Sequence, residues 1–174
     1  MRWIILMRAV NVGGTGKLSM RELRQALEKD GAEAVATYIQ SGNLVLTLDE
    51  PDPRAVEARI GALVEAQFGI RPGVMAFAPE AIDAALDGTP GPEPDEPQHM
   101  YMLFFTGTPN ADVAARLEEF CTQGEEVMLG ATCLYLHAPD GLGRSKLGRK
   151  VEKALGCPAT ARNLNSVRKV REMV

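Results

Sequence analysis

The sequence predicts an α+β protein made of two ferredoxin-like β-α-β-β-α-β units, a duplicated arrangement, followed by a C-terminal helix. Apolar runs of strand length alternate with amphipathic segments of helical length, and the order is the same in both halves. A stretch rich in Pro, Gly and acidic residues, 88–98, separates the halves. The 174 residues are 45% apolar, enough to bury a core without disulfides or a structural metal.

The first unit is predicted over 1–78. It begins with a near-continuous apolar strand, typical of the centre of a sheet, and a glycine-rich loop leads from it into a helix. Ser19 and Glu22 form a capping-box sequence at the start of that helix, and Gly31 ends it. A hairpin turning at 41–43, where Gly42 and Asn43 tolerate positive φ, a second helix and a closing strand complete the unit. The predicted strands are 2–10, 34–39, 44–48 and 73–78, and the second helix starts at Asp52-Pro53 and reaches Phe68.

Residues 79–98 are predicted to connect the units through a short helix near 79–87 and the linker. The second unit, 99–174, repeats the order of the first with little residue identity and includes the terminal helix. Its strands are expected at 99–106, 125–129, 132–137 and 158–162, and its helices at about 110–122, about 144–155 and from about 164.

Composition excludes several classes of protein. No apolar run approaches the roughly 20 residues that span a bilayer. Arg8 interrupts the N-terminal apolar run and no cleavage site follows, so a buried strand is predicted there rather than a signal peptide. Cys121, Cys133 and Cys157 form no CxxC pair, and there are two histidines. We therefore expect no metal, no cofactor and a cytoplasmic location.

Charge is unevenly distributed. Residues 1–140 carry 10 Lys and Arg against 21 Asp and Glu, a net charge of −11, whereas residues 141–174 carry nine against two, a net charge of +7. Such asymmetry is typical of proteins with a polyanionic partner. A basic tail that pairs with the acidic remainder of the chain explains it equally well, and both interpretations stay open.

The loop 11–17 has part of the pattern of a nucleotide-binding P-loop. That motif needs a hydroxyl residue directly after its lysine and a glycine at its first position, but this chain has Leu18 and Asn11 there. Nucleotide hydrolysis is therefore not predicted. The remaining feature is a glycine-rich loop before a helix N-terminus, where backbone N–H groups favour an anion, with Gly13, Gly14 and Lys17 as its elements.

A second anion-binding loop is predicted at Gly143, Arg144, Ser145 and Lys146, which open the expected helix 144–155. On that helix Lys146, Arg149, Lys150 and Lys153 form one basic stripe. A solvated helix face would have the same pattern. Further along, the candidates for the N-cap of the last helix are Asn163, Asn165 and Ser166. Helix capping does not account for the neighbouring Arg162.

Three segments taken together strongly resemble the bacterial family named domain of unknown function 1697. They are MRAVNVGGTGKLSMRELRQAL, TYIQSGNLVL and the region from DGLGRSKL to ARNLNSVRKV. The resemblance implies a duplicated ferredoxin-like fold, a cytosolic setting and no established activity or catalytic residue. The positions that match the recurring motifs of the family are polar or glycine in loops and element ends, where binding sites concentrate: Arg8, Asn11, Gly13, Gly14, Lys17, Ser41, Gly42, Asn43, Gly143, Arg144, Ser145, Lys146, Arg162 and Asn163.

No catalytic machinery is recognisable, and the function is left between three classes. The first is a binding protein for an anionic, phosphate-bearing small molecule or nucleic acid. For nucleic acid only weak binding is expected, because the central strands lack stacking aromatic residues. The others are an enzyme on a small anionic substrate and a protein-interaction or dimerisation module, with the oligomeric state left unknown. If a pseudo-twofold axis brings the corresponding loops of the two halves together, Lys17, Arg144 and Lys146 are predicted to converge with two helix N-termini on one cleft.

Overall fold

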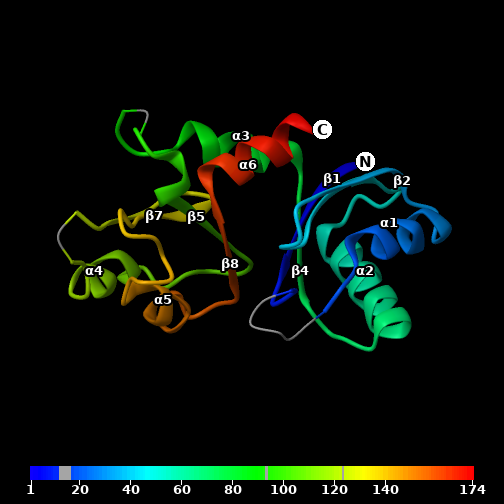
Figure 1. Ribbon diagram of the computed structural model, residues 1–174, viewed down its shortest axis with the longest axis horizontal. Helices are drawn as coiled ribbons and strands as arrows, with labels where there is room; N and C mark the ends of the chain where they lie inside the picture. Colours follow the sequence, from blue (N-terminus) through cyan, green and yellow to red (C-terminus); the bar gives the residue numbers. More distant parts are fainter. Residues whose placement is uncertain (12–16, 93, 123) are drawn as a thin grey trace. The chain divides into compact units, whose positions relative to one another are not determined.

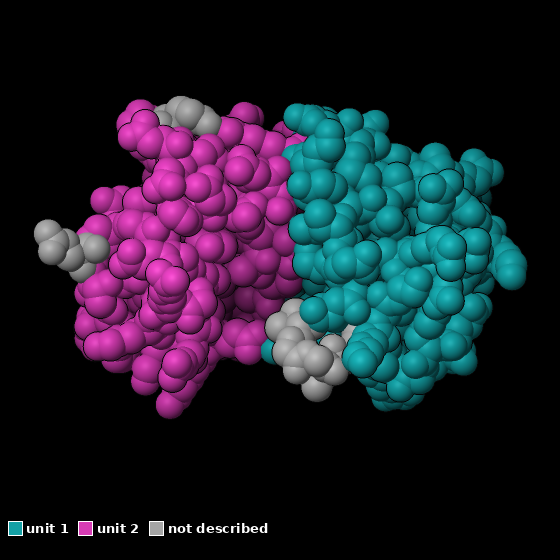
Figure 2. Space-filling model, viewed as in Figure 1, with its two compact units in different colours: residues 1–81, 169–174 teal, residues 82–168 magenta. Residues whose placement is uncertain are grey.

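The computed structural model describes residues 1–11, 17–92, 94–122 and 124–174 (Figure 1). The chain divides into two compact units (Figure 2), one made of residues 1–81 and 169–174 and the other of residues 82–168. The divisions fall inside helix α3 (Pro79–Asp87) and helix α6 (Leu164–Glu172). Each unit contains one four-stranded antiparallel sheet in a β-α-β-β-α-β order, which confirms the predicted α+β fold with two similar halves and a C-terminal helix.

In the first unit the sheet order is β2-β3-β1-β4, and every pairing is antiparallel. The apolar N-terminal segment is a central strand, as predicted. Helices α1 and α2 lie together on one face of this sheet (Figure 1), where they enclose an apolar core. The elements are β1 (Arg2–Arg8), α1 (Met20–Lys29), β2 (Glu33–Tyr38), β3 (Asn43–Thr47), α2 (Pro53–Phe68) and β4 (Gly73–Phe77).

The two predicted N-cap residues of this unit, Ser19 and Asp52, are confirmed. The hydroxyl of Ser19 accepts a hydrogen bond of 3.3 Å from the N–H of Glu22. The carboxylate of Asp52 accepts one of 3.0 Å from the N–H of Arg54, and Pro53 follows at the first helical position. Gly69 ends α2 with φ of 67°, in the left-handed region that glycine adopts freely.

The hairpin turn between β2 and β3 differs in detail from the prediction. Gly42 has the expected positive φ, 77°, but the second residue with positive φ is Ile39, at 48°, rather than Asn43. A β-branched residue in this region is unusual, because its side chain crowds the backbone. The Asn43 side chain instead lies buried and holds the turn together, which a hairpin motif read from sequence does not reveal.

In the second unit the sheet order is β6-β7-β5-β8, again antiparallel throughout. A short 3₁₀ turn, η1 (Pro97–His99), leads into the central strand. A second apolar core lies between this sheet and its two helices. The elements are β5 (Met100–Phe105), α4 (Val113–Glu118), β6 (Glu126–Leu129), β7 (Cys133–His137), α5 (Leu147–Leu155) and β8 (Ala159–Asn163).

Both helices of the second unit are shorter than predicted. Asn110 cannot start α4, because its side chain donates to Ala154 O at 2.9 Å and its N–H to Leu155 O at 2.9 Å. The start of α5 moves from residue 144 to Leu147, because Arg144 lies in a turn and donates its N–H to Gly141 O. Among the described residues, no helix is long and apolar enough to cross a membrane.

Candidate functional site

In the first unit, Asn11 connects two loops at the end of the sheet. Its side-chain amide donates to Leu18 O at 2.9 Å and to Gln40 O at 2.8 Å. Its side-chain oxygen accepts from the N–H of Leu18 at 2.9 Å. The side chain thus bonds like a peptide group of a strand and joins the segment after β1 to the hairpin turn.

Backbone strain concentrates at the same place. Ala9, Asn11 and Ile39 all have positive φ, at 61°, 54° and 48°. Conformations of this kind cost free energy and persist where the surrounding structure enforces them, often at functional sites. Ile39 is 52% exposed, one of the most exposed large apolar residues described. The end of this sheet is therefore a strained surface that exposes an apolar side chain.

The structure also describes Arg8, Lys17, Ser41 and Asn43 among the residues predicted in this unit. Asn43 is fully buried and donates to Tyr38 O at 3.1 Å and to the Ser41 hydroxyl at 2.9 Å. Arg8 lies at the end of β1 opposite Gly73 of β4, and Lys17 is exposed. Gly13 and Gly14 lie outside the described residues. The structure thus joins Asn11 to the turn that contains Ser41 and Asn43.

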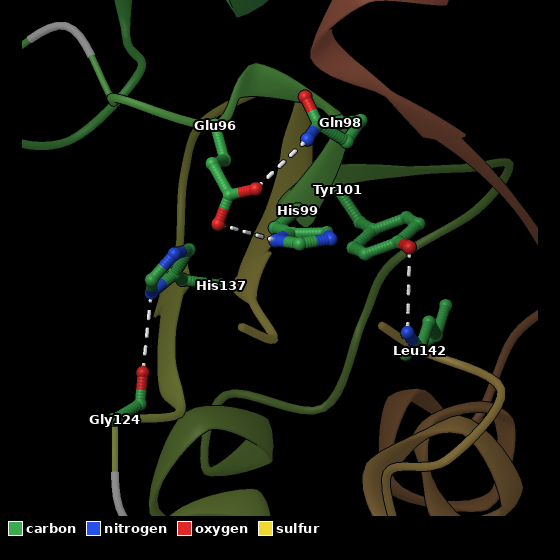
Figure 3. Close-up of polar contacts among 7 residues, drawn as sticks. All are labelled: Glu96, Gln98, His99, Tyr101, Gly124, His137 and Leu142. Atoms are coloured by element: carbon green, nitrogen blue, oxygen red, sulfur yellow. Dashed lines mark hydrogen bonds and ion pairs between the residues drawn. The ribbon is translucent and has the colours of Figure 1, made fainter. Parts of the chain in front are cut away.

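In the second unit, a tyrosine holds the loop that contains the other predicted anion site (Figure 3). The hydroxyl of Tyr101 accepts a hydrogen bond of 3.3 Å from the N–H of Leu142. Close by, His137 Nδ1 donates to Gly124 O at 3.1 Å, and Glu96 Oε2 lies 3.3 Å from His99 Nδ1. These contacts hold the segment before β6 and the loop after β7 against the sheet.

A carboxylate from the chain itself contacts this predicted anion loop. Burial raises the pKa of Glu125, but hydrogen bonds from the Ser145 hydroxyl and the Thr122 N–H, with the nearby Lys146 ammonium, bring it below its ordinary value. The Thr122 bond is 2.8 Å long. The Ser145 hydroxyl also accepts from the N–H of Leu147 at 3.0 Å. Two of the four predicted donors therefore already serve an internal anion, while Gly143 and Arg144 are exposed.

Arg162 and Asn163 have different environments on β8. Arg162 is buried, at 8% exposure, and its guanidinium donates to Thr160 Oγ1 and Ala161 O, both at 2.8 Å. Burial lowers the pKa of Arg162 to about 10. Asn163 caps the last helix, because its side-chain oxygen accepts from the Ser166 N–H at 2.9 Å. This agrees with one of the three caps that the sequence left open.

A cavity of about 230 Å³ opens between α4 and α5. Its apolar wall is formed by Leu117, Phe120 and Ala154. Its charged residues are Arg116, Glu119, Lys150 and Lys153, so cations outnumber anions three to one. Both apolar and cationic groups are therefore available to one ligand.

The lysines of this cavity are accessible. Lys150 Nζ lies 4.9 Å from the centre of the Phe120 ring, in cation–π contact. Arg116 is paired with Asp112 at 2.7 Å, whereas the ion pairs among the described residues involve neither Lys150 nor Lys153. The basic stripe in the sequence indicated these lysines. That Leu117 and Phe120 lie across from them was not predicted, because only tertiary packing brings the two segments together.

The predicted convergence of Lys17 with Arg144 and Lys146 joins residues of different units and stays a prediction. Within the part of the chain that the structure describes, no group of three His, Cys, Asp or Glu side chains is placed to hold a metal ion. The candidate sites within the two units are the loop cluster around Asn11 in the first and the α4–α5 cavity in the second.

Comparisons with known proteins identify relatives of this chain. None of the curated proteins compared matches it significantly. The solved structure titled "The structure of conserved bacterial protein SP0830 from Streptococcus pneumoniae" matches with a TM-score of 0.77 and 24% identity, over 99% of this chain and 97% of the other. The likeness shows a shared fold. The family described as "Protein of unknown function (DUF1697)" matches residues 1–135, and the protein therefore belongs to the DUF1697 family.

Proposed function

We propose that the protein binds a small phosphate-bearing anion in the cavity between α4 and α5. The observation that carries this proposal is the presence of Lys150 and Lys153 beside an apolar wall in a cavity of about 230 Å³. Small-molecule sites commonly combine an apolar lining with a few polar groups that fix orientation. This volume lies just below the range of about 300–1,000 Å³ typical of drug-sized ligands, so a compact ligand is expected.

The electrostatics of α5 support an anion. Arg149, Lys150 and Lys153 are exposed within one nine-residue helix, and like charges three or four residues apart repel each other. A phosphate bound between Lys150 and Lys153 would relieve that repulsion. It would approach from the α5 side, because Glu119 lies in the same lining and would repel it. The apolar wall would contact the uncharged part of the ligand.

A thermal-shift series tests this proposal. Inorganic phosphate carries only the charge, benzyl alcohol carries only the apolar ring, and phenyl phosphate carries both. The three compounds together therefore separate the effect of the charge from that of the apolar contact. A ligand that binds the native state raises the melting temperature by mass action. Phenyl phosphate should give the largest shift because it can use both the lysines and the wall beside Phe120. If all three compounds leave the melting temperature unchanged at millimolar concentration, the cavity is not an anion site.

Two double variants locate the site. Lys150→Gln with Lys153→Gln should weaken phenyl phosphate binding by about tenfold or more, because charge-assisted hydrogen bonds contribute about 1.5–3 kcal/mol. Arg144→Ala with Lys146→Ala should cost about 0–1 kcal/mol of stability, as exposed charges do, and leave that binding in place. Lys29→Gln, a change of an exposed lysine on α1, is the matched control. Loss of binding in the Arg144 and Lys146 variant alone would place the site at the loop and reject the cavity.

Nucleic acid is a second candidate, supported by the net charge of +7 over residues 141–174. Binding through this region would be weak and without sequence preference. The logarithm of affinity for a short single-stranded DNA should fall linearly with the logarithm of salt concentration, because neutralised phosphates release counterions. Tight, salt-insensitive binding to one sequence would contradict this mode of binding.

A further inference from the structure

We propose that the outer edge of strand β6 binds an extended peptide with a basic residue, which pairs with β6 as a fifth strand. This is an interaction surface separate from the α4–α5 cavity, and it does not depend on the proposed anion binding. Addition of a strand to a sheet edge is a common way to recognise a peptide. Such binding needs backbone N–H and C=O groups that are free at the edge, a pocket for a side chain, and charged groups that select one kind of peptide.

The backbone groups follow from the pairing of β6 with β7. Gly130 donates its N–H to Cys133 O at 2.9 Å, so Gly130 and Cys133 form a hydrogen-bonded pair. In an antiparallel ladder, every second residue pair along the strands exchanges hydrogen bonds in this way. The pairs that exchange hydrogen bonds with β7 are then Met128–Tyr135 and Glu126–His137. The peptide groups of Val127 and Leu129 therefore point away from β7. They lie at the outer edge of the sheet and can bond an added strand.

The equivalent strand of the first unit has a bulge at its outer edge, whereas the register of β6 is regular. Strand β2 holds the matching edge position, and its register with β3 shifts between Glu33 and Ala36, with positive φ at Ala34. Such bulges hinder the addition of a further strand. The register of β6 is continuous over Glu126–Leu129, and the strand contains no proline or lysine. Its short length is its main remaining protection.

A cavity of about 270 Å³ lies beside this edge. Register places Met128 with Tyr135 and Glu126 with His137 on one face of the sheet, and Met100 shares that face through its pairing with His137. Met128 is 40% exposed. The Tyr135 hydroxyl donates to Ala85 O at 2.6 Å, which fixes one wall of the cavity. An apolar side chain of an added strand would enter here.

Charge indicates which peptide fits. Glu126 lines the cavity and lies two residues from Met128 on the same face. Burial raises the pKa of the Cys121 thiol, and the charges of Glu118 and Glu126 raise it further, so Glu118 adds to the negative charge of this region, whereas Glu125 is already bonded to Ser145 and Thr122. Strands of two copies of this chain would bring these acidic clusters together, which disfavours self-association. A partner with a Lys or Arg would complement them.

Pairing geometry then defines the order of residues in the partner. In an antiparallel strand the partner residue opposite Met128 comes two positions before the one opposite Glu126. Both project onto the cavity face. The partner should therefore carry an apolar residue followed two positions later by a basic one. The residue between them bonds with Val127 through its backbone.

The test uses labelled synthetic peptides and fluorescence polarisation. Acetyl-Ser-Thr-Leu-Thr-Lys-Ser-amide should bind with a dissociation constant below about 1 mM. Replacing its second Thr by Pro removes the N–H that would donate to Val127 O, and affinity should fall about tenfold. Replacing its Lys by Glu should weaken binding about two- to fivefold, as expected for a cross-strand charge pair. Absence of binding by the first peptide, or equal binding by the proline peptide, would overturn the proposal.

Protein variants localise the contact. Glu126→Lys should reverse the preference, so that the Glu peptide binds better than the Lys peptide, while Glu33→Lys on the bulged edge of β2 should change neither affinity. Val127→Pro should abolish peptide binding without loss of the hydrogen bonds between β6 and β7, because the N–H it removes points away from β7.

Sedimentation of the wild-type protein and of Val127→Pro is the complementary measurement. If the wild-type protein is a dimer that Val127→Pro makes monomeric, a second copy occupies the edge and the peptide proposal is wrong.

Discussion

Replacement of Gly42 by alanine is expected to destabilise the first unit by about 3 kcal/mol. Gly42 has φ of 77°, where an L-residue is strained, and it is buried in the turn between β2 and β3. A Cβ atom at this position would lie 2.6 Å from both Met7 Cβ and Val10 Cγ2. The end of β1 would have to move away from the turn, and Met7 could then no longer keep its 2.7 Å bond to Gly42 O.

Gly69→Ala is the matched control for this change. Gly69 has a similar φ of 67°, but a Cβ there would meet no atom within 4 Å. Backbone strain alone should cost about 1 kcal/mol. Urea denaturation followed by circular dichroism measures both values, and the difference between them reports the contact with Met7 and Val10. Equal destabilisation by the two substitutions would show that the turn accommodates a methyl group and that strain alone matters.

The parts of the fold predicted correctly depend on local pattern. Ser19 and Asp52 act within one helical turn of their own position, so their roles can be recognised from the sequence. The strands were recognisable for a similar reason, because near-continuous apolar runs such as that of β1 fit a buried central strand. Repetition of one order in both halves then predicted two similar units.

The parts that were missed depend on contacts between distant residues. Asn110 ends up outside α4 because it bonds Ala154 and Leu155, more than 40 residues away. The α4–α5 cavity forms from Phe120 and Lys150, which no local motif connects. The positive φ of Ile39 contradicts the intrinsic preference of a β-branched residue, so only the packed structure can enforce it. Asn11 shows the same limit most clearly: its position was recognised, but not its bonds to Leu18 and Gln40.

Asn11→Ala is accordingly expected to cost about 2.5–5.5 kcal/mol, from three lost hydrogen bonds at about 0.5–1.5 kcal/mol each and about 1 kcal/mol for a less tolerated positive φ. Asn163→Ala is the matched control, since it removes one capping bond and should cost about 1 kcal/mol. Urea denaturation of both variants gives the comparison. If the two substitutions cost the same, Asn11 does not hold the two loops together.

Asn11→Asp tests the role of the Asn11 amide donor through the way in which the stability of the variant changes with pH. The shape and the acceptor for the Leu18 N–H remain, but the group that donated to Leu18 O and Gln40 O becomes a carboxylate oxygen facing two carbonyl oxygens. This repulsion should raise the pKa of the new carboxyl in the folded state above the value of about 3.9 expected for the unfolded chain. The folded state then binds more protons than the unfolded state between those two values, so the stability of the variant relative to wild type must fall as pH rises through that window. Relative stability that rises with pH there would mean that the carboxylate finds donors, and that the bonds of Asn11 to the two carbonyls do not hold the loops.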